Sequence, residues 1–267
     1  CPPCLPPSPT VAPLSTSVRT LCDEMARWGW RRTLTRLPGY VGSRLLAPWR
    51  ERAAVVADSE ESVKVALMHR DQYFRQLLAK PDALLAPSRF LQRVFAGWGV
   101  PAHRILHVGN GVDAEGLVRP RSPSKGVLRL AYLGSIVPHK GLHVLIAAMQ
   151  RLADVPVELC IYGDDQASPE VSRYAAELRR QAVGARVRFA GRLPHVRVGE
   201  ALAATDVLVL PSILYENCPL SILEALYAGV PVIASNIGGM AELVHDGQNG
   251  FCFRVGDAAD LADKIGM

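Results

Sequence analysis

From Val127 onward, short apolar runs alternate with longer segments of helical pattern, and this alternation limits the possible folds more than any other feature. Apolar strands separated by helices are typical of a parallel sheet that is covered on both faces. We therefore expect an α/β fold with a doubly wound, Rossmann-like sheet. The expected strands are 128–133, 157–162, 187–190, 207–210, 231–234 and 251–253, and the expected helices lie near 140–152, 169–183, 197–203, 220–227 and 240–245, with another beginning at Asp257.

The loops that follow these strands are the first place to look for a ligand site. In doubly wound sheets, ligands bind at the carboxyl ends of the strands, where the strand order reverses. All such loops lie at the same edge of the sheet, so we treat them as parts of one candidate site. They follow Leu133, Tyr162, Ala190, Leu210 and Ala234.

The loop after residue 210 carries two carboxylates, Glu216 and Glu224, separated by seven residues. Pro219 suits the first turn of a helix that we expect over 220–227. The free N–H groups at the start of a helix attract anions or sugar oxygens. With Glu216 before the helix and Glu224 one turn inside it, the pair can hold the hydroxyl groups of a polyol from two directions. The residues between them that we assign to ligand binding are Asn217, Cys218, Pro219, Leu220 and Ser221.

A second candidate segment runs from Gly134 to Gly141. It follows an expected strand and opens an expected helix, so its backbone N–H groups can meet a phosphate. Lys140 would add a point charge for a diphosphate. Taken alone, a lysine at a helix start is more often only a solvated residue.

These segments together resemble the retaining GT-B glycosyltransferases, specifically glycosyltransferase family 4. The motif of Glu216 and Glu224 is followed by Ala-Leu and by Gly-Val-Pro-Val-Ile-Ala-Ser at 229–235. Residues 133–141 resemble the phosphate loop of that family, Asn110-Gly111-Val112-Asp113 its interdomain linker, and 86–90 the last strand-to-helix turn of its N-terminal domain. The resemblance covers residues 80 to 267 in the family's order.

The resemblance implies a role for each matching residue. Glu216 would contact the donor sugar and support positive charge near the anomeric carbon, while Lys140 would bind the diphosphate and Glu224 the ribose. A turn at Gly238 and Gly239, next to Glu242, would bring the backbone close to the donor. Gly134, Ser135, Gly163 and Arg192 would complete the donor site, with 163–165 near the nucleotide and 191–193 beside the base.

The implied activity is transfer of a hexose-type sugar from a nucleotide-diphosphate sugar, with retention of configuration (EC 2.4 class). The acceptor would be a polysaccharide, a glycolipid or another lipid-linked glycan, as in cell-surface polysaccharide biosynthesis. In this family the reaction is thought to proceed on one face, with the leaving diphosphate taking the acceptor's proton. We therefore expect no cofactor and no metal. The family-level expectation for location is the cytoplasm, peripheral at the inner face of the membrane.

Two departures from the family pattern bear on activity. The family commonly has arginine where this chain has Ser135, so one cationic diphosphate contact is missing; Lys140 would act with helix N–H groups, or Arg192 or His139 would help. The family's N-terminal domain also supplies the acceptor site and a histidine near the reacting centre, and these precede the segment where this chain starts. We expect a partial N-terminal domain over 1–109, a linker over 110–126 and a donor-binding domain over 127–267. We expect this fragment, which looks cut at both ends, to bind donor weakly without turnover.

Other readings of the chain remain open. A nucleotide-binding or scaffolding module of the same fold, without chemistry, is favoured by Ser135 and opposed by Lys140, Glu216 and Glu224. Nucleotide-sugar 2-epimerases share the fold but lack this carboxylate motif. An NAD-dependent oxidoreductase is disfavoured because no G-x-G-x-x-G motif opens a strand–helix unit.

Net charge and cysteine spacing limit the kinds of partner and metal site that the sequence favours. The net charge of +5 fits anionic partners, which leaves an anionic membrane surface open. Nucleic acid is disfavoured because zinc-finger spacing and like-charge runs are absent. Cys1 and Cys4 form a lone C-x-x-C with no histidine before His69, which disfavours a zinc site. Before residue 60 we expect a loop over 1–16, a basic helix over 17–36 with Trp28 and Trp30, and a strand at 53–57.

Overall fold

The computed structural model describes residues 60–117 and 126–267. The loop, basic helix and strand expected before residue 60, and the cysteine pair near the start, lie outside these ranges. The chain divides into two compact units, residues 1–82 and 83–267. In the first unit, the described part contains helix α4, Glu60–Leu78. No helix in the described ranges combines the length and apolarity needed to cross a membrane.

The second unit begins with a small strand–helix–strand segment. Strands β1 (Leu84–Ala86) and β2 (Ile105–His107) pair in parallel, and between them lie helix α5 (Arg89–Gly97) and the 3₁₀ helix η1 (Ala102–Arg104). Ser88 caps α5 by accepting a hydrogen bond from the Leu91 N–H, as expected for a serine at this position.

The rest of this unit is a six-stranded parallel sheet in the order β5-β4-β3-β6-β7-β8. From β3 the chain builds outward to β5, then returns to the other side of β3 and builds outward to β8, so the order reverses between β3 and β6. The predicted doubly wound α/β sheet is thereby confirmed. Its strands are β3 (Leu128–Leu133), β4 (Val157–Tyr162), β5 (Val187–Gly191), β6 (Val207–Leu210), β7 (Val232–Ser235) and β8 (Gly250–Phe253).

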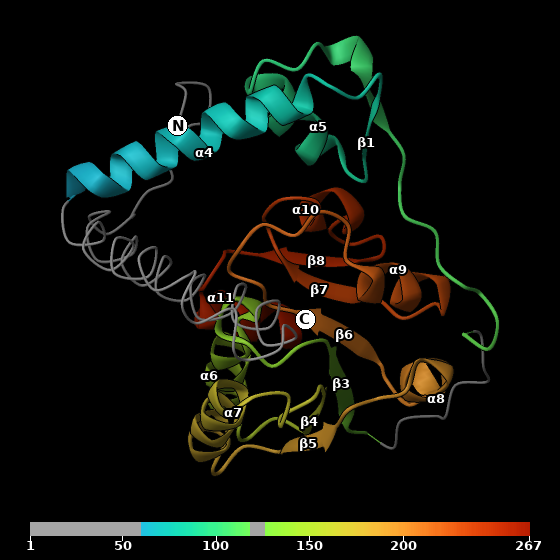
Figure 1. The fold of residues 1–267 in the computed structure, drawn as a ribbon. Coiled ribbons are helices and arrows are strands. Elements are labelled where there is room, and N and C mark those ends of the chain that lie inside the picture. The colour runs from blue at the N-terminus through green and yellow to red at the C-terminus, as the bar shows by residue number, and fades with distance from the viewer. Residues whose placement is uncertain (1–59, 118–125) are drawn as a thin grey trace, which may run out of the picture. The chain divides into compact units, whose positions relative to one another are not determined.

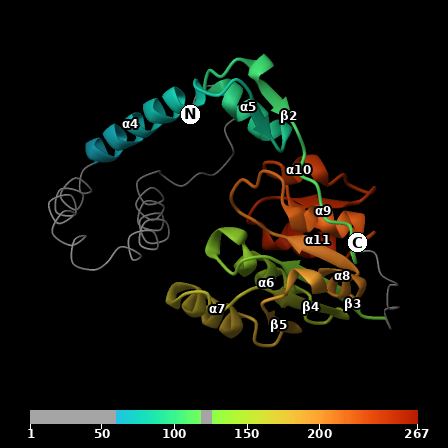
Figure 2. The ribbon, with the colours of Figure 1, turned by 45° about the vertical axis from the view of Figure 1, so that its right-hand side comes forward.

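Helices cover both faces of this sheet. Helix α6 packs against α7 and α11 on one face, whereas α8 and α9 lie on the other (Figures 1 and 2). The helices are α6 (Leu142–Arg151), α7 (Pro169–Gln181), α8 (Val198–Ala203), α9 (Leu220–Tyr227), α10 (Met240–Leu243) and α11 (Ala258–Ile265), with 3₁₀ turns η2 (Pro138–Lys140) and η3 (His195–Arg197).

The core explains why the apolar runs form these strands. Side chains from β3, β4, β6 and β7 are buried against α6 and α9, and burying aliphatic surface is the main favourable term in folding. Because both sheet faces are covered, every β7 residue is buried and no alternation of apolar and polar residues is needed. The largest fully buried side chains of this sheet and its helices include Tyr132, Leu145, Ile146, Leu159, Ile161, Leu178 and Phe253.

Candidate functional site

The candidate site lies where the strand order reverses, between the loops that follow β3 and β6. These strands pair through Leu130 with Val207 and through Ala131 with Leu208, so their carboxyl ends are neighbours. The loop after β3 runs from Gly134 to Gly141, and the loop after β6 from Pro211 to Pro219. Both segments that were singled out in the sequence therefore meet at the predicted edge.

Tyr132, in β3, supports the loop that follows this strand. This side chain is fully buried, and its hydroxyl donates a hydrogen bond of 2.8 Å to the Ser135 carbonyl. Burial, and then the charge of Glu216, raises the pKa of Tyr132, so the hydroxyl stays protonated and remains a donor. The N–H of Gly134 donates to the carbonyl of Tyr162 on the neighbouring strand, at 3.1 Å. These two hydrogen bonds attach the loop after β3 to the sheet.

Lys140 does not begin a helix, which corrects the sequence prediction. Residues Pro138–Lys140 form the 3₁₀ turn η2, and Gly141 then takes the left-handed conformation (φ 72°) before α6 starts at Leu142. A Cβ at Gly141 would lie 1.9 Å from the Pro211 carbonyl oxygen. Only glycine meets both demands, so the helix begins two residues later than expected and the two loops come into contact.

The centre of the site is an ion pair between Lys140 and Glu216. The Lys140 Nζ lies 2.5 Å from the Glu216 Oε1, and both side chains are largely buried. Ser212, which is fully buried at the end of β6, donates its hydroxyl to the same oxygen at 2.9 Å. Both donors therefore use Oε1, and no protein donor to Oε2 is present in the described ranges. That second oxygen is available to a ligand hydroxyl.

Helix α9 begins where the sequence predicted, but Pro219 is its N-cap residue and not a residue of its first turn. Proline has no side-chain acceptor to cap the helix. In the described part of the chain, the N–H groups of Cys218, Leu220 and Ser221 have no protein acceptor, whereas those of Ile222 and Leu223 bond to the Pro219 carbonyl. The three N–H groups predicted to point out of the helix start are thus available to an anion or a sugar oxygen.

Glu224 lies one turn inside α9 with a mostly buried side chain. Its Oε1 is 3.5 Å from Nε2 of His195, an exposed residue of η3 after β5. A carboxylate beside an imidazole can accept hydrogen bonds from a ligand's hydroxyl groups on its open side. Glu216 thus lies before the α9 N-terminus, paired with Lys140, and Glu224 lies inside the helix, beside His195.

The glycine turn packs directly on the Glu216 loop. The Gly239 N–H donates to the Glu216 carbonyl at 2.7 Å, and a Cβ at Gly239 would lie 1.5 Å from the Asn217 carbonyl oxygen. No other residue type fits this approach. Gly238 and Gly239 therefore hold the main chain of Glu216 and Asn217 in place.

Gly163 and Arg192, two further predicted site residues, differ in where they lie. Gly163 is buried, and a Cβ there would lie 2.4 Å from the Gly134 carbonyl oxygen, so it lies against the loop after β3. Arg192 is exposed after β5, and within the described ranges no hydrogen bond or ion pair joins it to Lys140 or Glu216. The structure thus brings Lys140, Glu216, Gly134, Gly163 and the glycine turn together, and leaves Arg192 apart.

Sequence reasoning missed three residues that the site uses. Ser212, just after β6, donates its hydroxyl to Glu216, and Tyr132, inside β3, donates its hydroxyl to the Ser135 carbonyl. His195 lies beside the Glu224 carboxylate. The available signal was a polar side chain at the carboxyl end of a strand otherwise made of aliphatic residues.

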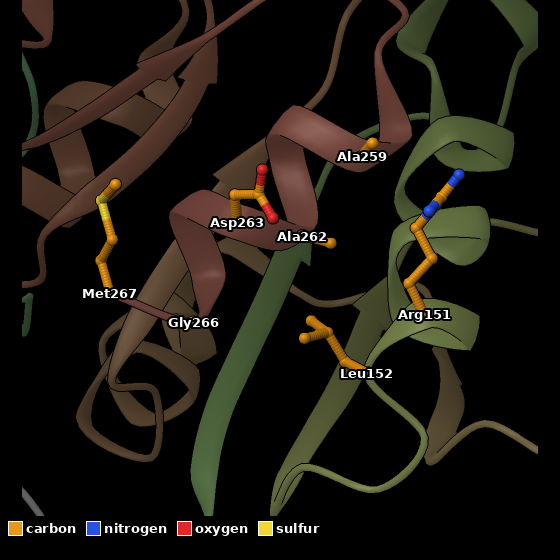
Figure 3. A pocket seen from close by; sticks show the side chains of 7 residues that line it. All are labelled: Arg151, Leu152, Ala259, Ala262, Asp263, Gly266 and Met267. Atoms are coloured by element: carbon orange, nitrogen blue, oxygen red, sulfur yellow. The ribbon is translucent and has the colours of Figure 1, made fainter.

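The surface depression drawn in Figure 3 is separate from this site. It has a volume of about 470 Å³ and lies between the end of α6, at Arg151 and Leu152, and the segment from Ala259 in α11 to Met267. None of the candidate site residues lines it. Residues 60–117 and 126–267 contain no group of three or more His, Cys, Asp or Glu side chains arranged to hold a metal.

Comparison with known proteins relates this arrangement to sugar transfer. Glycogen synthase of Mycobacterium tuberculosis H37Rv is 34% identical over 193 residues, which are 71% of this chain and 46% of that protein. Sulfoquinovosyl transferase SQD2 of Arabidopsis thaliana is 29% identical over 199 residues, covering 69% of this chain and 37% of the relative. The chain therefore spans about half the length, or less, of these relatives.

A solved structure shows the same fold with ligands. The crystal structure of Anabaena Alr3699/HepE in complex with UDP and glucose superimposes with a TM-score of 0.60 at 29% identity, over 69% of this chain and 52% of that one. The family model for glycosyl transferases group 1 matches residues 119–266, which contain every residue of the Lys140, Glu216 and Glu224 site. The chain belongs to the glycosyl transferases group 1 family.

Proposed function

We propose that this chain is the donor-binding part of a retaining glycosyltransferase of family 4, which transfers a hexose-type sugar from a nucleotide-diphosphate sugar to a glycan or lipid-linked acceptor. The observation that carries the proposal is the Lys140–Glu216–Ser212 cluster, which lies at the strand-order reversal beside the unpaired N–H groups of α9. Named relatives transfer sugars, and the HepE structure holds UDP and glucose.

The cluster suggests how the donor would be received. Lys140 is engaged by Glu216 in the ligand-free protein, and a diphosphate would draw its ammonium away, because a dianionic group is a stronger partner than one carboxylate. Ser212 would then keep the Glu216 carboxylate in place, leaving Oε2 for a sugar hydroxyl. Glu224 would hold the ribose. Fixed charges arranged in advance are the protein's main means of stabilising a transition state.

In this scheme the chain supplies positions and charge, and no side chain removes a proton. The departing diphosphate takes the proton of the acceptor hydroxyl while the new bond forms on the same face. Glu216 would stabilise the positive charge that develops near the anomeric carbon. We further propose that no cofactor or metal takes part, that the protein works in the cytoplasm, at an anionic membrane surface, and that residues 1–109 and 127–267 are the acceptor-side and donor-side domains.

The test is calorimetric titration of the chain with UDP, GDP and ADP. We expect saturable binding of one of them, weakened at least tenfold by Lys140→Ala and by Glu224→Ala. A matched control is Lys264→Ala, which removes the same charge from α11, where the ammonium lies over the Phe251 ring. Absence of binding by a folded chain, or equal loss with the control, would contradict the assigned site.

A second candidate, a nucleotide-binding module without transfer, is favoured by one observation. Because Ser135 stands where the family commonly has arginine, Lys140 is the only cationic side chain paired at the centre of the described site. Its ammonium is already paired with the Glu216 carboxylate. Both candidates predict no turnover by this chain alone, so turnover can exclude the second candidate but its absence favours neither. The chain alone should bind nucleotide without transferring sugar; transfer by the chain alone, abolished by Glu216→Ala, would show that it is a complete catalyst.

A further inference from the structure

The loop that carries Glu216 is contacted by Phe90 of α5 and by Asn110, which follows β2. We propose that the first turn of α5 and Asn110 are positioning elements for this loop, acting through an aromatic stack, a helix cap and a backbone hydrogen bond. This inference rests on the proposed function, since it concerns how Glu216 is presented to the donor sugar.

The aromatic stack joins Phe90 of α5 to Tyr215, the residue before Glu216. The two ring centroids are 4.8 Å apart and the planes differ by 21°. Offset stacked rings attract one another beyond the area they bury. Because the side chains of Glu216 and Tyr215 leave the chain at adjacent residues, fixing the ring restricts the backbone from which the carboxylate extends.

The helix cap joins the start of α5 to the glycine turn. Glu242 Oε2 accepts a hydrogen bond of 2.7 Å from the Arg89 N–H, and its Oε1 accepts one of 2.9 Å from the Arg93 guanidinium. A carboxylate at a helix N-terminus satisfies a free N–H and interacts favourably with the helix dipole. Residues 153 positions apart in the chain are thus joined by one side chain.

The aromatic stack and the helix cap both act on the loop that carries Glu216. Glu242 lies in α10, a helix that begins directly after Gly239, and the Gly239 N–H donates to the Glu216 carbonyl. The Asn110 side-chain amide donates to the Cys218 carbonyl at 3.1 Å, on the far side of Glu216. The loop is therefore held before, at and after its catalytic carboxylate.

The loop needs such support because it has little core packing of its own. Tyr215 is 60% exposed and Leu214 44% exposed, even with the stack in place. Segments with few buried apolar contacts open locally at low free energy. Ser212 and Lys140 hold the carboxylate, but the main chain of 214–217 depends on its neighbours in α5 and α10.

The experiment is hydrogen-exchange mass spectrometry on the 267-residue chain, with the Gly239 amide as reporter. We expect Phe90→Ala and Glu242→Ala each to raise its exchange rate about tenfold, and Tyr215→Phe, which keeps the ring, to leave it unchanged. Phe95→Ala is the matched control, because Phe95 contacts Trp98 at the other end of α5. The Asp206 amide, which donates to Arg129 at the opposite sheet edge, serves as an internal reference for global folding.

The stack itself is tested by combining substitutions. If Phe90 acts through Tyr215, the double variant Phe90→Ala/Tyr215→Ala should exchange at Gly239 no faster than either single variant. Additive effects, or equal acceleration by Phe95→Ala, would overturn the proposal. So would unchanged exchange at Gly239 in a variant whose Asp206 amide is as protected as in the parent chain.

Nucleotide titration keeps this inference separate from the proposed function. The positioning variants should bind UDP, GDP or ADP as the parent chain does, because the diphosphate and ribose are assigned to Lys140 and Glu224. Loss of nucleotide binding in Phe90→Ala would count against a role limited to the loop. Failure of the parent chain to bind any of these nucleotides would contradict the proposed function whatever the exchange data show.

Discussion

Two ion pairs join the β3 and β6 segments, one at each edge of the sheet, and their chemistry differs. Arg129 and Asp206 pair at the amino-terminal edge, and Lys140 and Glu216 at the carboxyl edge. Burial is similar, with side chains 18% exposed in the first pair and 23% and 19% exposed in the second. The two pairs differ in how many hydrogen-bond acceptor positions of the carboxylate are occupied by protein donors.

At the amino-terminal edge the carboxylate is saturated. Asp206 Oδ2 accepts from the Arg129 backbone N–H and Nε, and Oδ1 accepts from Nη2. The hydrogen bond to Asp206 raises the pKa of Arg129 further, so the pair stays charged. At the other edge a lysine supplies a point charge to one oxygen only. A filled pair serves stability, whereas a pair with one oxygen left open can receive a ligand.

The largest expected effect is on stability, from Asp206→Ala. This change leaves the arginine fork in a mostly buried place without its carboxylate, and we expect it to lower the free energy of unfolding by about 3 kcal/mol. Urea denaturation would measure it. Glu158→Ala, which removes an exposed carboxylate near the same arginine, should cost less than about 0.5 kcal/mol. Equal effects would show that burial of the pair is unimportant.

Lys140→Ala should show the reverse pattern. The affinity for the nucleoside diphosphate should fall at least tenfold, or about 1.4 kcal/mol. The loss of stability should be smaller than for Asp206→Ala, because Ser212 still donates to Glu216. Calorimetry and urea denaturation of the same samples would measure both. The contrast between the two edges fails if Lys140→Ala destabilises the chain as much as Asp206→Ala.

The sequence anticipated the scaffold better than these pairs. Strands and helices in 127–267 were predicted to within two residues, because aliphatic runs bounded by turn residues have few alternative structures. The resemblance also singled out Lys140 and Glu216, each as a separate ligand contact. Their mutual contact was not foreseen, because it joins residues 76 positions apart and depends on Gly141 bringing two loops together.

The saturated pair was missed for a different physical reason. Arg129 is a charged residue within an apolar strand and Asp206 directly precedes another, and each alone is typical of a solvated strand end. They become partners only because β3 and β6 are neighbours in the sheet, although Leu130 and its partner Val207 are 77 positions apart in the chain. Strand order is a property of the whole sheet, and local pattern does not encode it.

Ser212→Ala is expected to have a smaller effect, about 1 kcal/mol in the free energy of unfolding, the usual net value of one hydrogen bond to a charged or polar group. Combined with Lys140→Ala, the loss should exceed the sum of the single losses, since Glu216 then keeps no donor to Oε1. A double-mutant cycle by urea denaturation would measure this coupling. Simple additivity would mean that the two donors do not share one carboxylate in solution.

The smallest expected effect concerns pH and a pair that belongs to neither edge. The Nδ1 atom of His143, in α6, lies 3.0 Å from the hydroxyl oxygen of Tyr174, in α7. Burial lowers the pKa of His143 below 6.5. Between that lowered value and about 6.5 the unfolded chain binds more protons than the folded one, so stability should fall as pH drops through this window. We expect a loss below about 1 kcal/mol, measured by urea denaturation at several pH values.

His143→Gln should remove this pH dependence, whereas Tyr174→Phe should keep it, because burial and not the hydrogen bond is the cause of the lowered pKa. Carboxyl groups in model peptides titrate near about 4, below this window. A pH slope that survives His143→Gln would therefore come from another group and would contradict its assignment to His143.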